Sequence, residues 1–151
     1  ILMIGTGGTI ASEMTPEGLT PELSTHQLLA YLPRIAQLCH CEFCIDITSM
    51  TLAARSGSQD KLLAVADWRS STLFSEKERL ALAYAEAATQ TPPAVDDALR
   101  SAMAAHFDAR ALTELTALIG LQNLSARFNA AMAIPAQGLC QIPTSSSQNK
   151  E

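Results

Sequence analysis

A helix start signal at Ser75 constrains the fold of this chain more than any other local feature. The stretch Ser75-Glu76-Lys77-Glu78 has the form of a capping box, in which two side chains satisfy backbone N–H groups that the first turn leaves unpaired. Its acidic residues also suit the positive end of the helix dipole. Apolar residues continue the pattern at Leu80, Leu82, Ala83 and Ala87. The signal predicts a helix from Ser75 to about Thr89.

Helical signals continue on both sides of this element. Ser24 and Gln27 form a second capping-box pattern before an apolar face, which Pro33 is expected to interrupt or kink. Because Ala and Leu are abundant and aromatic residues make up only 5% of the chain, we expect helices rather than a β-sandwich. The predicted fold class is therefore all-α. Further helices are expected through Cys44 to near Gly57, over Ser58–Trp68, over Val95–Phe107, and from behind Asp108 to about Ala133.

Residues 1–23 have a different pattern. The apolar run Ile1-Leu2-Met3-Ile4 predicts a short strand, and the glycine-rich stretch that follows it predicts a turn. Pro16, Gly18 and Pro21 then predict a loop. The expected architecture is thus a helical domain preceded by a short strand-turn segment.

Charge and hydropathy exclude two classes of partner. The formal net charge is −5 and no basic cluster is present, so a phosphate backbone would find no electrostatic attraction. No apolar run approaches the roughly 18 residues that a membrane-spanning helix needs. The N-terminus carries no signal-peptide pattern, and three cysteines crowded into Cys39–Cys44 differ from a secreted disulfide scaffold. We therefore expect a cytoplasmic protein that binds neither nucleic acid nor membrane.

The chemistry of the chain is centred on the CxxC pair Cys41-Glu42-Phe43-Cys44. This spacing brings two sulfurs within disulfide reach if the segment opens a helix, and a helix N-terminus stabilises the reactive thiolate. Such a pair cycles between dithiol and disulfide when an electron donor is available. Two other interpretations stay open on spacing alone. Cys39, His40, Cys41 and Cys44 could contribute to a zinc site, although structural zinc usually draws two separated pairs, or the thiols could be buried and inert.

Several segments in a fixed order carry a family resemblance. They are Ala36–Asp46, Trp68–Glu76, Leu80–Ala87, and Leu115–Ile119 continuing through Asn123, Arg127 and Ile134-Pro135. Over about residues 36–136 the chain resembles the alkylhydroperoxidase-D / carboxymuconolactone decarboxylase family. The resemblance implies a helical fold, reduction of a small-molecule peroxide by Cys41 and Cys44, and a thiol or lipoyl-type electron donor. It also implies a homo-trimer or hexamer, and we expect neither a cofactor nor a metal.

The chain departs from that family at two positions. Many active members carry a His four residues after the second cysteine and a Glu twelve residues before the first, and here these places are Thr48 and Leu29. Those groups relay the proton that activates the thiol, so the resemblance implies at most a weak peroxidase. In the family the second cysteine, here Cys44, attacks the peroxide, whereas the general behaviour of CxxC pairs favours Cys41. The alternatives are a non-catalytic helical oligomer with vestigial cysteines and, more remotely, the family's decarboxylase chemistry.

Residues 1–38 resemble a different family. Ile4–Ser12 and Gly18–Pro21 are similar to the first strand and turn of the bacterial L-asparaginases, with Thr6 at the place of their nucleophilic threonine. No Gly-Thr-Asp-Thr run or associated lysine matches the rest of that family's site, and Asp46-Ile47 lacks the serine of its Asp-Ser pair. We therefore expect no hydrolysis of asparagine.

The predicted organisation has three parts that join two ancestries near Cys39–Cys41. They are an asparaginase-like segment over 1–38, an alkylhydroperoxidase-like helical domain over 39–139 and a disordered tail over 140–151. The tail is expected to lack structure because its residues are mostly polar.

Overall fold

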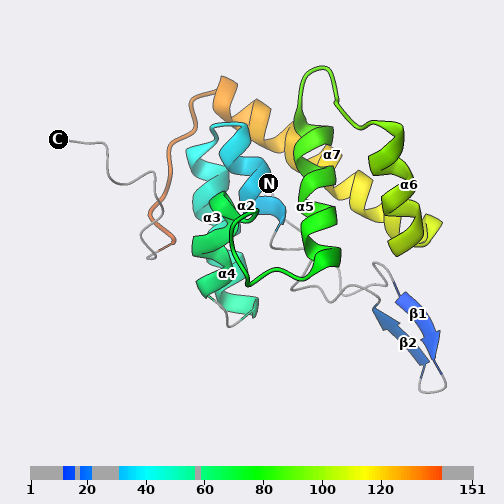
Figure 1. Ribbon diagram of the computed structural model, residues 1–151. Coiled ribbons are helices and arrows are strands. Elements are labelled where there is room, and N and C mark those ends of the chain that lie inside the picture. Colours follow the sequence, from blue (N-terminus) through cyan, green and yellow to red (C-terminus); the bar gives the residue numbers. More distant parts are fainter. Residues whose placement is uncertain (1–11, 16–17, 22–30, 57–58, 141–151) are drawn as a thin grey trace.

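A bundle of helices forms the body of the protein in the computed structural model, which describes residues 12–15, 18–21, 31–56 and 59–140 (Figure 1). α7, the longest of these helices, passes behind α5 in Figure 1, while α2, α3 and α4 lie on one side and α6 on the other. Among the described residues no helix combines the length and the hydropathy that crossing a membrane requires. The predicted all-α fold class is confirmed. The helices are α2 (Tyr31–Leu38), α3 (Glu42–Ser56), α4 (Gln59–Ala64), the short 3-10 helix η1 (Val65–Asp67), α5 (Glu76–Thr89), α6 (Asp97–His106) and α7 (Ala109–Ala131).

A β-hairpin precedes the helices where the sequence predicted a loop. β1 (Ser12–Thr15) pairs antiparallel with β2 (Gly18–Pro21), with Ser12 opposite Pro21 and Thr15 opposite Gly18. Both strands of a two-stranded sheet are edge strands, which tolerate the missing N–H of Pro21. The loop prediction was wrong here, because each short segment supplies the hydrogen-bond partner that the other lacks. The strand predicted at Ile1-Leu2-Met3-Ile4 lies outside the described residues.

The helix start predicted at Ser75 is confirmed. The Glu78 N–H donates to Ser75 Oγ at 3.3 Å, and the Ser75 N–H donates to Glu78 Oε2 at 2.8 Å. Asp108 caps α7 in a similar way by accepting the N–H of Ala111 at 2.6 Å. These local bonds satisfy backbone donors that the first turn of each helix leaves unpaired, and so fix where α5 and α7 begin.

Pro33 does not interrupt α2. Over the described residues α2 runs from Tyr31 through Pro33 to Leu38. The expected break is therefore absent. The capping box predicted at Ser24 and Gln27 lies outside the described residues.

The main core lies between α2, α5, α6 and α7. Its fully buried members include Tyr31 and Ile35 from α2, Leu82 from α5, Met103 from α6 and Leu115 from α7. α2 contacts α3, α5 and α7, although it precedes the domain boundary predicted at residue 38. Packing thus joins α2 to the helices that follow, and the ancestry of the two parts stays a prediction.

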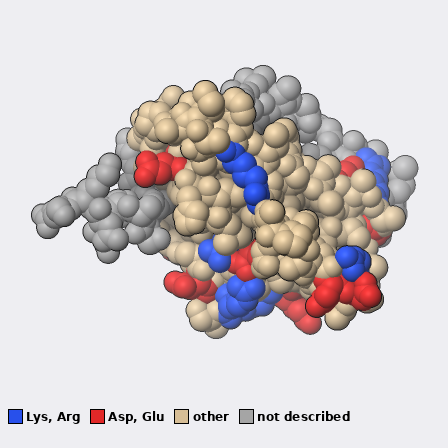
Figure 2. Space-filling model, turned by 90° about the horizontal axis from the view of Figure 1, so that it is seen from above, with Lys and Arg blue, Asp and Glu red and all other residues tan. Residues whose placement is uncertain are grey.

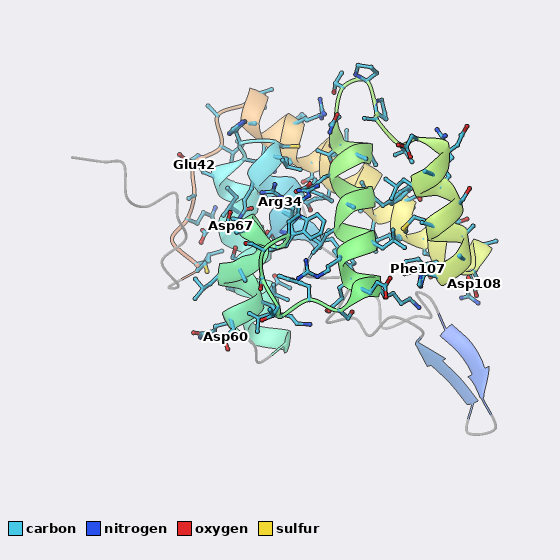
Figure 3. All side chains as sticks on the ribbon, viewed as in Figure 1. Arg34, Glu42, Asp60, Asp67, Phe107 and Asp108 are labelled. Carbon is cyan, nitrogen blue, oxygen red and sulfur yellow. A yellow bond between two sulfur atoms is a disulfide. The ribbon has the colours of Figure 1, made fainter. Side chains whose placement is uncertain are left out.

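Charged side chains lie mostly at the edges of the face in Figure 2, where uncharged residues cover much of the middle. Glu86 on α5 is different, because it is only 8% exposed. Its Oε1 accepts from Arg34 Nε at 2.5 Å and from Trp68 Nε1 at 3.0 Å, and its Oε2 lies 2.5 Å from Arg69 Nη2. Figure 3 labels Arg34 on α2, the helix that packs against α5. This one carboxylate therefore connects α2 and the turn after η1 to α5.

Candidate functional site

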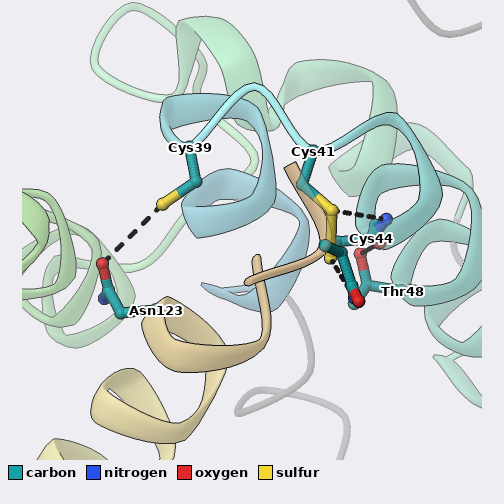
Figure 4. Close-up of a disulfide and its surroundings, with 6 residues drawn as sticks. Cys39, Cys41, Cys44, Thr48 and Asn123 are labelled. Carbon is teal, nitrogen blue, oxygen red and sulfur yellow. Dashed lines mark hydrogen bonds between the residues drawn. A yellow bond between two sulfur atoms is a disulfide. The ribbon is translucent and has the colours of Figure 1, made fainter. Parts of the chain in front are cut away.

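Cys41 and Cys44 form a disulfide at the start of α3 (Figure 4). Cys41 directly precedes α3, and its Cα lies 5.2 Å from that of Cys44. The Cys44 N–H donates to Cys41 Sγ at 3.1 Å, so a sulfur takes the place of the usual capping oxygen. After reduction, the same N–H and the helix dipole would stabilise a thiolate on Cys41.

A tight turn between α2 and α3 positions this disulfide. The Cys41 N–H donates to the Ala36 carbonyl at 3.1 Å, and the His40 N–H donates to the Gln37 carbonyl at 3.1 Å. Together these bonds form a Schellman motif, which ends a helix through one residue of left-handed conformation. That residue is His40, whose φ is 51°, and its backbone makes the turn.

α7 covers both sulfurs. Cys41 is 1% exposed and Cys44 is 2% exposed, and both belong to a buried cluster that includes Ala126 of α7. Asn129, itself buried, donates from Nδ2 to Cys44 Sγ at 3.4 Å. The sequence analysis did not identify Asn129. The one indication in the sequence is an amide side chain placed one turn after Ala126, on the face of α7 that is buried. Each sulfur of the pair therefore accepts one N–H.

Cys39 belongs to a separate site, although it lies only two residues from Cys41. Its side chain points away from the disulfide and toward Asn123, with Sγ 3.7 Å from Asn123 Oδ1 (Figure 4). Burial raises the pKa of the Cys39 thiol, and the guanidinium of Arg127 offsets part of that rise. Burial therefore disfavours the thiolate form of Cys39, which is the nucleophilic form.

The structure does not assemble the zinc site that the spacing left open. Cys39 and Cys41 point in different directions, and Cys41 is already bonded to Cys44. Within the part of the chain that the structure describes, no three His, Cys, Asp or Glu side chains gather closely enough to hold a metal ion. Four ligands around one ion would require Cys39 to turn toward the pair.

Thr48 occupies the position at which many active members of the alkylhydroperoxidase-D family have the relay histidine. It is 2% exposed, and its hydroxyl donates to the Cys44 carbonyl at 2.6 Å. A hydroxyl held in this way offers no base near neutral pH. Leu29, at the place of the relay glutamate, lies outside the described residues. Thr48 thus supports the local helix and does not replace the relay.

Asp46 fastens the chain that follows α7 onto α3. Its Oδ2 accepts the N–H groups of Gln137 and Leu139 at 2.9 and 3.0 Å, and its Oδ1 accepts that of Cys140 at 2.6 Å. Burial would raise the pKa of Asp46, but the N–H groups of Cys140, Leu139, Gln137 and Gly138 hold it below its usual value. The sequence placed Asp46 at the end of the Ala36–Asp46 segment of the family resemblance and beside the asparaginase Asp-Ser pair, whereas the structure shows it as an anchor. Thr6, the nucleophile of that comparison, lies outside the described residues.

Comparison with solved structures defines the class of fold. The apo debrominase Bmp8 superposes with a TM-score of 0.71 at 24% identity, over 76% of this chain and 62% of that chain. ATU0492 from Agrobacterium tumefaciens, a protein of unknown function associated with antioxidant defence under the name AhpD, gives 0.70 at 22% identity over 76% and 80%. An uncharacterized peroxidase-related protein from Silicibacter sp. TM1040 gives 0.68 at 16% identity over 87% and 65%. The helices therefore have an AhpD-like fold.

Sequence comparisons give a relative and a family. Over 110 residues the chain is 79% identical to the uncharacterized protein YnjA of Escherichia coli (strain K12). The match covers 73% of this chain, which spans only 60% of YnjA. The profile of the family described as Asparaginase, N-terminal matches residues 1–111, and the chain belongs to that family. Residues 31–56 and 59–111 fall inside this match, and the structure contains no strand over those two ranges.

Proposed function

We propose that the chain is a thiol-dependent redox protein that reduces peroxides with Cys41 and Cys44. The observation that carries this proposal is the disulfide at the start of α3, in which each sulfur accepts an N–H. Solved proteins of the same fold are named for antioxidant defence and for a relation to peroxidases, which supports a peroxide as the oxidant. A reducing cytoplasm suits such a pair, because thiols persist there between reactions.

The proposed reaction has two steps on the protein. A thiolate attacks one oxygen of the peroxide, so that an S–O bond forms, the O–O bond breaks, and the alcohol or water leaves with a proton. The second cysteine then displaces water from the sulfenic acid, and the S–S bond forms. A dithiol donor of lipoyl or similar class returns two electrons and two protons. Because Thr48 offers no base, we propose slow turnover, with protons exchanged with solvent.

The first prediction concerns the pairing of the four cysteines in the sequence. One equivalent of peroxide added to the reduced protein should remove two thiols, and peptide mapping should find Cys41 linked to Cys44. The Cys39→Ser variant is the matched control and should form the same link, because Cys39 points away from the pair.

Single substitutions within the pair identify the attacking cysteine. Cys41→Ser and Cys44→Ser both prevent the disulfide, and only the variant that keeps the attacking sulfur should accumulate a sulfenic acid that dimedone traps. Linkage through Cys39 or Cys140, or survival of all thiols in a folded protein, would refute the proposal. The second of these results would favour the non-catalytic helical oligomer.

We also propose that the chain self-associates through α7. Leu121, Leu124 and Phe128 follow one another at helical spacing along α7, with Met132 at its C-cap, and each is at least 56% exposed. Soluble monomers seldom leave such a continuous apolar stripe in contact with water. The family resemblance supports a trimer or hexamer.

The second prediction is that size-exclusion chromatography with light scattering finds a discrete trimer or hexamer. Leu124→Lys should shift it to monomer, because Leu124 is 67% exposed within the stripe. Leu63→Lys, at a site that is 54% exposed on α4, is the matched control and should leave the assembly intact. A wild-type monomer, or equal effects of the two substitutions, would contradict an interface on α7.

Hydrolysis of asparagine is not part of the proposal, although the chain belongs to the asparaginase N-terminal family. Beyond Thr6, the groups that activate the family's threonine have no counterpart in the sequence. A hydroxyl without an activating base is a weak nucleophile.

A further inference from the structure

A second candidate site lies between α5, α6 and α7. These helices and the loop that joins α5 to α6 line a cavity of about 820 Å³ that is open to solvent on one side. Its walls are largely apolar and include Val95, Met103, Leu112 and Ile119. Neither Cys41 nor Cys44 lines it. The cavity is therefore separate from the disulfide.

The charges that line this cavity have one sign. Arg100 and Arg127 are among the lining residues, and no Asp or Glu is. This is unusual in a chain with a formal net charge of −5. Arg100 is paired at 2.6 Å with Asp97, which does not line the cavity. Among the described residues, no carboxylate pairs with Arg127, so this guanidinium is the stronger candidate for binding an anion.

Neighbouring polar groups hold Arg127 at one end of the cavity. Its Nη2 donates to the Thr89 carbonyl at 2.7 Å, and its guanidinium also interacts with the Cys39 thiol. The lining residue Asn123 is fixed beside it, because Nδ2 donates to Thr89 Oγ1 at 3.0 Å and to the Ile119 carbonyl at 2.9 Å. A guanidinium has five N–H donors, so donors remain for a ligand.

We propose that this cavity binds a monocarboxylate with an unbranched apolar chain, such as a medium-chain fatty acid. The carboxylate would pair with Arg127, and the hydrocarbon chain would lie against the apolar walls. Charge complementarity selects an anion, and the apolar lining selects a ligand with a hydrocarbon body over a small hydrophilic anion. The site does not depend on the redox chemistry of Cys41 and Cys44.

Gly120 offers a way to fill the cavity without disturbing the fold. It lies in α7 and lines the cavity, and a Cβ built on it meets no atom within 4 Å. A larger residue at this place can therefore extend over the cavity without a backbone clash. Replacing a glycine inside a helix also tends to stabilise that helix. Loss of binding in Gly120→Leu would then reflect occupied space and not an unfolded protein.

The test uses octanoate and the uncharged 1-octanol as probes, with binding to the full chain followed by calorimetry and NMR shifts. Octanoate should bind more tightly than octanol. Arg127→Gln should weaken the binding of octanoate by about tenfold or more, which is the scale of a lost charge-assisted contact. The same substitution should leave the binding of octanol unchanged. Gly120→Leu should weaken both probes. Arg110→Gln, near the start of α7 and outside the cavity, is the matched control and should bind both as wild type does.

Three results would overturn the proposal. They are no octanoate binding by the wild type, equal loss in Arg127→Gln and Arg110→Gln, or unchanged binding in Gly120→Leu. Circular dichroism of each variant shows whether the helices are intact, and Arg127→Lys provides a second variant that keeps the charge and should retain part of the preference for octanoate. Failure of Arg127→Lys to bind octanoate better than Arg127→Gln would also count against a role for the charge.

Discussion

Glu86→Ala is expected to lower the free energy of unfolding by about 3–5 kcal/mol, the range for a buried ion pair that loses one partner. The substitution leaves the Nε1–H of the buried Trp68 and the largely buried guanidinium of Arg34 without the carboxylate that they share. The Trp68 Nε1–H is then desolvated without its acceptor, and the Arg34 guanidinium keeps its bond to Gln37 Oε1 at 3.3 Å but loses the carboxylate. Leaving buried donors unpaired costs more than the bonds themselves contributed. Urea unfolding followed by far-UV circular dichroism measures the change. Trp68 fluorescence is unsuitable, because the substitution alters its immediate surroundings.

Glu114→Ala is the matched control for Glu86→Ala. Glu114 pairs with Arg110 at 3.1 Å on α7, but the two side chains are 26% and 50% exposed. Exposed pairs contribute little, so the expected change is below about 1 kcal/mol. Similar losses in the two variants would show that burial of Glu86 does not set the size of the effect.

Asp46→Asn is expected to lower the free energy of unfolding by about 1–3 kcal/mol and to release the chain after α7. The amide that replaces one carboxylate oxygen points N–H groups at backbone N–H donors, so part of the anchor at Gln137, Leu139 and Cys140 is lost. The half-buried Cys140 should then react faster with a thiol reagent, while Cys39 serves as an internal reference. Glu42→Gln, an exposed carboxylate on the same helix, should change neither stability nor Cys140 reactivity appreciably.

The effect of Asp46 should also depend on pH. Its pKa is lower in the folded protein than in the unfolded chain, where an aspartate titrates near about 3.9. Its contribution to stability is therefore fully present above that unfolded value and is lost as the pH falls through the lower folded value. The difference between wild type and Asp46→Asn should stay constant above roughly pH 5 and narrow in acid. A difference that grows as the pH falls would contradict the anchoring role.

Elements with local signals were predicted from the sequence, and features that depend on distant residues were not. The caps at Ser75 and Asp108 act within a single turn, so their helices begin where the sequence indicates. The hairpin requires two segments to pair, and neither segment alone looks like a strand. Pro33 was expected to interrupt or kink a helix. The position of a proline within its helix decides whether it does so, and the sequence alone did not show that position.

The candidate site divides in the same way. The spacing of Cys41 and Cys44 was enough to predict that their sulfurs come within bonding reach. The separation of Cys39 from the pair follows from the turn at His40, for which the sequence offers no glycine as a marker. Asn129 reaches Cys44 across 85 residues of sequence, and no local pattern connects positions that far apart.

Under the proposed redox function, burial of Cys41 and Cys44 limits how an electron donor reaches the pair. With exposed fractions of 1% and 2%, the disulfide gives a bulky reductant nothing to attack until the start of α3 separates from α7. The observed rate would then rise with reductant concentration and level off at the rate of that local opening. Under such gating, bystander thiols exchange slowly even where equilibrium favours reduction. An effective electron donor would then be one that promotes the separation of α3 from α7. The reduction potential of the donor would matter less.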